Sequence, residues 1–287
     1  MELKGKGVLI TGASRGLGVE MARQFGKQGA RLAIAARSKG ELEQVASALQ
    51  AEGISTTAIP TDVGDRSSLE ALVAQATLNL GGIDVLVNNA GVEQVYDFEE
   101  MNLDLIEQII QVNVTGLIAL TRLVSPAMID RRSGHIVNIS SMAGLLPVPH
   151  NSVYSASKHA VVGFSRSLRL ELAEHGVGVS VVCPGFVEGG MFERWGRPAP
   201  SAAGAVSVDA VAKATVGAVI NNSAEVKVNS ALGKLGPVIH ALSPSVSGGL
   251  IHRTGVAKFL KSQAELNKRQ ESTITLDAPV ETPVATD

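Results

Sequence analysis

Short runs of apolar, largely β-branched residues alternate along the chain with longer segments of helical pattern. The runs lie at residues 8–11, 31–35, 56–59, 85–88, 135–139 and 179–182, and the helical segments at 18–28, 41–51, 67–80, 103–130, 154–174 and 208–221. Strands that are apolar on both faces need helices on both sides, as in a parallel sheet. The alternation predicts an α/β fold, a doubly wound parallel sheet with helices on both faces. We expect Ser67 and Ser207 to cap the helices beside them, since a hydroxyl can accept from the free amides of a first turn.

Composition excludes several classes of protein. Of the 287 residues, 45% are apolar, and their even spread favours one large core with a tail over two domains. The formal net charge of -2 gives no argument for binding nucleic acid or an anionic membrane, because both call for a basic patch. Cys183 is the only cysteine, so no disulfide can form within the chain, and the early first strand leaves no room for a leader. We therefore expect a cytoplasmic enzyme.

A glycine-rich turn, TGASRGLG, directly follows the first predicted strand. Its glycines, Gly12, Gly16 and Gly18, allow a tight turn and a close approach of the backbone to a pyrophosphate, and the next helix offers free amides. With a second strand about twenty residues on, this predicts a nucleotide site. An ordinary strand-to-helix turn is the alternative. The glycine spacing differs from the usual dinucleotide fingerprint.

Three motifs in this order resemble those of the short-chain dehydrogenase/reductase family. They are the glycine-rich turn, Asn88-Asn89-Ala90-Gly91 after the fourth predicted strand, and Tyr154-x-x-x-Lys158 at the start of a helix. The resemblance covers about residues 5–222. It implies a Rossmann-like fold, a cofactor of NAD(H) or NADP(H), and hydride transfer between nicotinamide and a carbonyl or alcohol carbon. It also implies a homodimer or homotetramer, because the helices from Leu103 and Tyr154 resemble the family's dimer-forming pair.

Tyr154 and Lys158 lie four residues apart, which places both side chains on one helix face. An ammonium beside a phenol in a partly dry cleft should lower the tyrosine pKa from about 10, so that Tyr154 can act as general acid and base. The resemblance adds Ser141, which would aim the substrate oxygen at Tyr154. It also adds Asn113, which would perturb its helix so that a water relays protons to Lys158. Taken singly, each of the four residues could have a purely structural role.

The end of the second predicted strand, Ala35-Ala36-Arg37, has no carboxylate where an NAD site usually has one. Arg37 could bind a 2′-phosphate with its planar fork, and Arg15 could approach the same phosphate. We therefore predict NADP(H) as the preferred cofactor and NAD(H) as the alternative, although either arginine could be a solvated surface charge. The resemblance implies further cofactor contacts from Ser14, Asp62, Val63, Asn89, Gly91, Val187, Tyr154 and Lys158. The six histidines and the cysteine show no ligand spacing, so we expect no metal.

The segment 188–205 combines glycine, proline and alanine with large apolar side chains, as expected of a mobile lid over a pocket. We expect the pocket walls to be Leu145, Leu146, Val148, Met191, Phe192 and Trp195. No arginine cluster awaits a substrate carboxylate or phosphate. The sequence therefore favours a lipophilic ketone, aldehyde or secondary alcohol of steroid, retinoid or acyl type. A non-catalytic nucleotide-binding protein with the same fold is the alternative function.

The chain is expected to comprise a catalytic domain at residues 1–222, including the lid, an extension at 223–269 that packs on it, and a disordered tail at 270–287. The extension is apolar but contains Pro237 and Pro244, so we do not expect it to span a membrane. We favour a cap over the substrate pocket. An oligomer contact and peripheral membrane contact are the alternatives.

Overall fold

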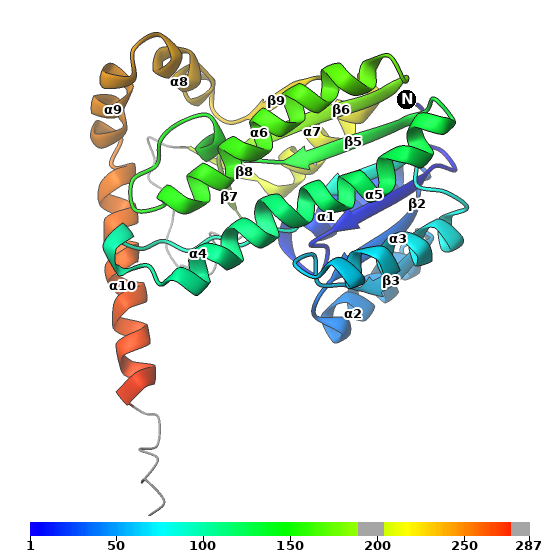
Figure 1. Ribbon diagram of the computed structural model, residues 1–287, viewed down its shortest axis with the longest axis horizontal. Coiled ribbons are helices and arrows are strands. Elements are labelled where there is room, and N and C mark those ends of the chain that lie inside the picture. Colours follow the sequence, from blue (N-terminus) through cyan, green and yellow to red (C-terminus); the bar gives the residue numbers. More distant parts are fainter. Residues whose placement is uncertain (189–203, 277–287) are drawn as a thin grey trace, which may run out of the picture.

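The computed structural model describes residues 1–188 and 204–276 (Figure 1). Its main strands are β1 (Gly7–Thr11), β2 (Arg31–Ala36), β3 (Thr56–Pro60), β4 (Val85–Asn88), β5 (Gly134–Ile139), β6 (Val177–Pro184) and β9 (Glu225–Val228). They form one seven-stranded parallel sheet in the order β3-β2-β1-β4-β5-β6-β9. A separate two-stranded parallel ladder pairs β7 (Phe186–Glu188) with β8 (Ala205–Ser207).

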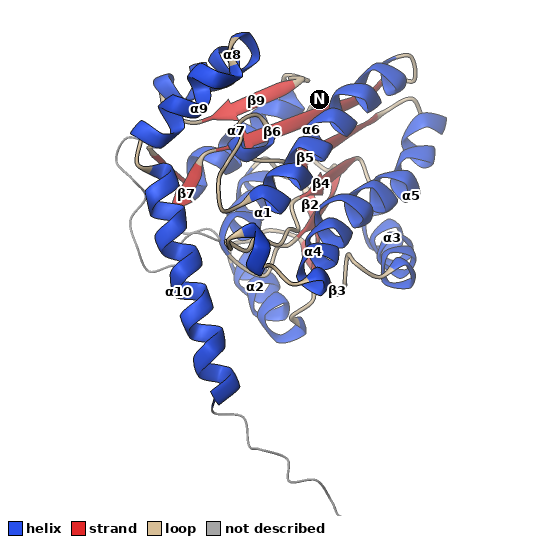
Figure 2. Cartoon of the chain, turned by 60° about the vertical axis from the view of Figure 1, so that its left-hand side comes forward, coloured by secondary structure: helices blue, strands red, loops and turns tan. Residues whose placement is uncertain are grey.

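Helices cover both faces of the sheet (Figure 2). They are α1 (Gly16–Lys27), α2 (Lys39–Ala51), α3 (Arg66–Leu80), α4 (Leu103–Ile110), α5 (Leu117–Asp130), α6 (Ser152–Ala173), α7 (Val208–Ile220), α8 (Ala231–Leu242), α9 (Pro244–Arg253) and α10 (Val256–Leu276). In β1, Val8 and Ile10 pack into the core on one face, and Leu9 packs into the core on the other. This double burial is why the strands are apolar throughout, and the predicted doubly wound α/β fold is confirmed.

Helix α3 begins differently from the prediction. Asp65 caps it, since its carboxylate accepts from the backbone N–H of Ser68 at 2.8 Å, while Ser67 lies inside the helix and donates its hydroxyl to Asp65. The predicted cap at Ser67 is therefore wrong, because the carboxylate of Asp65, two residues earlier, already accepts from the free amides. The predicted cap at Ser207 is confirmed: its hydroxyl accepts from the N–H of Ala210 at 3.1 Å.

The sheet and the last helix both extend beyond the predicted boundaries. Strand β9 pairs with β6 from Glu225 to Val228, so the sheet continues past residue 222. Helix α10 runs to Leu276, past the start of the predicted tail at 270. Residues 277–287 and most of the predicted lid, 189–203, lie outside the described residues.

One helical stretch in the described part of the chain, Leu103–Asp130, is long and apolar enough to cross a membrane, with a mean hydropathy of 1.5. Half of its most apolar window is buried, and the α5 side chains Leu120, Val124 and Met128 pack in one of the two sheet cores. The core helix of a soluble protein meets the same criterion, so this stretch gives little support for a membrane span.

A buried histidine should make the fold sensitive to acid. His135 on β5 is buried, its Nε2 lies 2.8 Å from the Ser180 hydroxyl, and burial, with a smaller effect from Arg169, lowers its pKa from 6.5 to about 4. Between these values the unfolded chain binds a proton that the folded chain does not, so the free energy of unfolding falls as pH falls. We expect this group alone to remove about 2 to 3 kcal/mol by pH 4. Urea unfolding of the wild type and of His135→Asn across this range would test it: the variant should lose less stability, and equal losses would contradict the assignment.

Candidate active site

A cavity of about 830 Å³ lies at the carboxyl ends of the sheet strands. Residues that end or follow each of the seven strands line it, among them Gly12 after β1, Arg37 after β2, Asn89 after β4, Ser140 after β5 and Gly185 after β6. The chain reverses its direction across the sheet between β1 and β4, which is where doubly wound folds bind their ligands. The fold thus places the cavity at the position expected for a nucleotide.

Every residue predicted to contact the cofactor lines this cavity. These are Gly12, Ser14, Arg15, Gly16, Gly18, Arg37, Asp62, Val63, Asn89, Gly91, Tyr154, Lys158 and Val187. Val187 lies on β7, Gly16 and Gly18 begin α1, and the others come from the turns after β1, β2, β3 and β4 and from α6. The structure therefore brings together residues that are spread over most of the sequence.

The glycines of the glycine-rich turn allow close packing of its backbone. Gly12 has a φ of 67°, and a Cβ atom there would lie 2.8 Å from the Cα of Ala90. At Gly18 a Cβ would lie 2.2 Å from the carbonyl oxygen of Gly12, so only glycine lets α1 start so close to the turn. Asn89 ties the two loops together, because its Nδ2 donates to the carbonyls of Thr11 at 2.9 Å and Gly12 at 3.0 Å. A glycine-rich backbone at a helix N-terminus fits a dinucleotide pyrophosphate.

Two arginines stand at one end of the cavity. Arg15 and Arg37 are exposed and line it together with Ser14 and Ser38. Neither guanidinium makes an ion pair with a carboxylate in the described part of the chain. This end can therefore receive a phosphate, and no acidic side chain after β2 opposes one.

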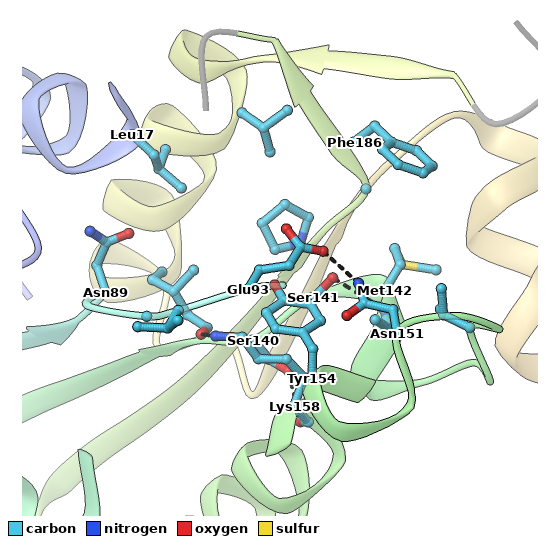
Figure 3. A pocket seen from close by; sticks show the side chains of 18 of the residues that line it. Leu17, Asn89, Glu93, Ser140, Ser141, Met142, Asn151, Tyr154, Lys158 and Phe186 are labelled. Atoms are coloured by element: carbon cyan, nitrogen blue, oxygen red, sulfur yellow. Dashed lines mark hydrogen bonds between the residues drawn. The ribbon is translucent and has the colours of Figure 1, made fainter. Parts of the chain in front are cut away.

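Tyr154, Ser141 and Lys158 meet in the middle of the cavity (Figure 3). Ser141 follows β5, and its hydroxyl hydrogen-bonds the Tyr154 phenol and accepts from the N–H of Ala143 at 3.1 Å. Lys158 lies one helical turn after Tyr154 on α6. Its Nζ donates to the carbonyl of Ile139 at 3.0 Å and lies 5.5 Å from the centre of the tyrosine ring. The three side chains predicted to act together are thus adjacent.

Burial raises the pKa of the Tyr154 phenol, the nearby Glu93 carboxylate raises it further, and the hydrogen bond with Ser141 opposes both effects. The sequence predicted that Lys158 would lower the pKa of Tyr154, and for the protein as described this prediction was wrong. The assumed cation is itself buried, and burial lowers the pKa of Lys158 to about 8 although Glu93 and Cys183 act to raise it. The structure holds Tyr154 as a neutral phenol, which is the form that donates a proton.

Asn113 does not line the cavity but lies beneath it, in a π-helical segment (Gln111–Gly116) between α4 and α5. Its Oδ1 accepts from the N–H of Val92 at 2.8 Å, and its Nδ2 donates to the Val92 carbonyl at 2.9 Å and to the Ser157 hydroxyl at 3.0 Å. A π-helical turn inside an α-helix often marks a functional site. The helix perturbation predicted at Asn113 is present, while the water relay to Lys158 stays a prediction.

The substrate end of the cavity has apolar walls that were predicted only in part. Leu146 and Val148 line it, whereas Leu145 packs instead in a core cluster with Met142 and Cys183. The predicted wall residues Met191, Phe192 and Trp195 lie outside the described residues. Further walls come from the C-terminal extension: Gly233, Gly236, Ile239, Ser247, Ile251, Thr254, Val256 and Leu260. This is the placement that a cap over the pocket requires.

Glu93 and Asn151 are among the polar residues of the cavity that were missed from the sequence. Asn151 precedes Tyr154 by one helical turn, and its Nδ2 donates to the Glu93 carboxylate at 2.6 Å. Two positional signals could have revealed them: Glu93 follows the Asn-Asn-Ala-Gly motif, and a three-residue step places Asn151 beside Tyr154. His150, by contrast, contacts Asp97 and is not among the cavity residues.

The match to a known family agrees with this geometry. The family model described as "short chain dehydrogenase" matches residues 6–199. This chain belongs to the short-chain dehydrogenase family. A ketoacyl reductase of Nostoc sp., HetN, is 43% identical over 269 residues, which cover 92% of this chain and 94% of that protein. A putative ketoacyl reductase of Streptomyces coelicolor is 42% identical over 182 residues, 63% of this chain and 70% of that protein.

A solved structure shows the same fold. A variant of actinorhodin polyketide ketoreductase, crystallised with NADPH, has a TM-score of 0.73 and 34% identity, covering 79% of this chain and 97% of that chain. This short-chain dehydrogenase is therefore an NAD(P)-dependent oxidoreductase, as the sequence predicted. Within the described residues, no group of three or more histidine, cysteine, aspartate or glutamate side chains could hold a metal ion.

Proposed function

We propose that this enzyme is an NADP(H)-dependent ketoacyl reductase that reduces the ketone of a lipophilic, acyl-type substrate. One observation carries the proposal: a single cavity runs from Arg15 and Arg37, past Tyr154, to the apolar walls around Ile251 and Leu260. Such a cavity can receive a phosphorylated dinucleotide at one end and an apolar chain at the other. Relatives named as ketoacyl reductases, and a similar structure that contains NADPH, favour an acyl chain over the steroid and retinoid alternatives.

When bound, the nicotinamide supplies the hydride that adds to the carbonyl carbon. Tyr154 then donates its phenolic proton to the carbonyl oxygen, which gives the alcohol. Its neutral state in the buried site suits this reductive direction. Ser141 orients the same oxygen through its hydroxyl, and Lys158, beneath the ring, favours the phenolate that forms when the proton leaves. Asn113 is a positioning residue, because it fixes the Val92 loop and α6 relative to each other.

Substrate class is tested by measuring NADPH oxidation. We expect the highest kcat/KM with β-ketoacyl thioesters of N-acetylcysteamine, rising as the acyl chain lengthens because more apolar surface is buried against α8–α10. A steroid ketone and retinal serve as comparison substrates of similar hydrophobicity. Faster turnover of either one would overturn the acyl assignment and leave the oxidoreductase in place.

Two further expectations stay predictions. Assembly into a homodimer or homotetramer is consistent with the exposed apolar side chains Leu103, Ile110, Ile118 and Leu170 on the helices of the predicted dimer face. Location in the cytoplasm rests on the sequence alone.

A further inference from the structure

Glu93 places an acidic group at the reaction centre of a cavity whose substrate side has mostly apolar walls. The residue follows β4, is partly exposed and lines the cavity. In Figure 3 its carboxylate lies beside Ser141 and Asn151, on the same side of the Tyr154 ring as the phenolic oxygen. Its charge raises the pKa of both Tyr154 and Lys158, which shows that it acts on the reacting groups. The proposed chemistry does not use this carboxylate.

Asn151 holds that carboxylate in place. It is 2% exposed, it precedes α6, and its Nδ2 donates to the Glu93 carboxylate at 2.6 Å. Its own Oδ1 is one of two buried side-chain atoms in the described residues that have no hydrogen-bond partner. Leaving a buried acceptor unpaired destabilises a protein by about 1 to 3 kcal/mol, so such a group calls for a reason.

The Glu93 carboxylate, which lines the cavity and is partly exposed, offers only lone pairs and is therefore a hydrogen-bond acceptor. A substrate with an N–H or O–H group at this position would gain a charge-assisted hydrogen bond. A substrate carboxylate at the same position would meet like charge and would have to lose its water.

We propose that Glu93, positioned by Asn151, is a specificity-determining residue that selects substrates with a hydrogen-bond donor beside the reacting ketone and rejects free keto acids. This inference rests on the proposed reduction of ketoacyl compounds. It narrows that class to neutral derivatives with a donor close to the ketone, such as β-ketoamides that carry an N–H.

Calorimetry on the enzyme loaded with oxidised cofactor separates binding from turnover, because no reduction can take place in that complex. The probes are N-methylacetoacetamide, which has an N–H donor, N,N-dimethylacetoacetamide, which lacks it, and acetoacetate, which is an anion. We expect the wild type to bind the first about tenfold more tightly than the second and to bind acetoacetate weakest. In Glu93→Gln the preference for the N–H amide should shrink to about twofold, and acetoacetate should bind about tenfold more tightly than in the wild type.

Glu99→Gln is the matched control, since it removes the same charge from an exposed residue of the same loop that does not line the cavity. Asn151→Ser, which removes the donor to Glu93, should also reduce the preference for the N–H amide. Thermal unfolding and cofactor affinity of each variant report whether it folds. Equal affinity of the wild type for both amides, or an unchanged ratio in Glu93→Gln, overturns the proposal even if both amides are reduced. Conversely, discrimination in binding without reduction of any ketoacyl compound would overturn the proposed function alone.

Discussion

Replacement of Tyr154 by phenylalanine should lower kcat/KM for ketone reduction about a thousandfold while NADPH still binds. Phenylalanine preserves the ring and its packing but removes the hydroxyl that hydrogen-bonds Ser141. No other tyrosine can replace it, because the chain has two and the second, Tyr96, does not line the cavity. General acid catalysis by a positioned group contributes about 10² to 10⁴ in rate. Steady-state NADPH oxidation gives the loss, and NADPH fluorescence gives the cofactor affinity.

Tyr96→Phe is the matched control for this variant. Tyr96 is also buried, so the same atom is removed from a comparable environment outside the cavity. The control should keep at least half of the wild-type turnover. Activity in Tyr154→Phe within tenfold of the wild type would remove the phenol from the mechanism, whatever the position of its ring.

The sheet could be predicted because its strands are buried on both faces. Every residue of β1, β4 and β5 is buried, and most of these residues are apolar, so no alternating surface pattern obscures the strands. The missed strand was β9, where Glu225 and Lys227 alternate with valines that are only half-buried. An edge strand needs no second apolar face, so it lacks the continuous apolar run by which the inner strands are recognised.

The candidate site could be predicted where one short motif supplies several of its residues. The glycine-rich turn and the Tyr154 motif each fix a local backbone, and the parallel sheet brings their ends together. The substrate side is different, because α8, α9 and α10 reach the cavity through long-range packing such as Phe259 against Phe186. No local spacing reports such contacts, which is why a cap from this extension was predicted but not the residues with which it lines the cavity.

The direction of the Tyr154 pKa shift could not be read from spacing either. A four-residue step gives the neighbour, Lys158, but not the burial that both groups share. Burial penalises the phenolate and the ammonium alike, and it is the largest cause of the pKa shift of each group. The carboxylate of Glu93, distant in sequence from α6, adds to the shift in the same direction.

The choice between the two nicotinamide cofactors depends on one end of the cavity. Arg37 follows β2 and lines the cavity with Ser38 and Arg15, and the predicted 2′-phosphate would lie among these groups. A bidentate guanidinium favours that phosphate, whereas a carboxylate at the same place would accept hydrogen bonds from two ribose hydroxyls and repel the phosphate. Replacing the side chain at this position should therefore change the ratio of the activity with NADPH to the activity with NADH more than it changes the sum of the two.

In Arg37→Asp we expect the ratio of kcat/KM with NADPH to that with NADH to fall about a hundredfold, which corresponds to about 3 kcal/mol of differential binding. Most of the change should appear in the KM for the cofactor, because Tyr154 and Ser141 at the reaction centre are untouched. Lys39→Asp, two residues further on, exposed and outside the cavity, makes the same change in charge without the proposed contact. If both variants shift the ratio equally, the net charge of this surface explains the preference for NADPH, and a direct contact from Arg37 does not. If neither does, the phosphate does not bind at Arg37, and the assignment of NADP(H) loses its basis in this chain.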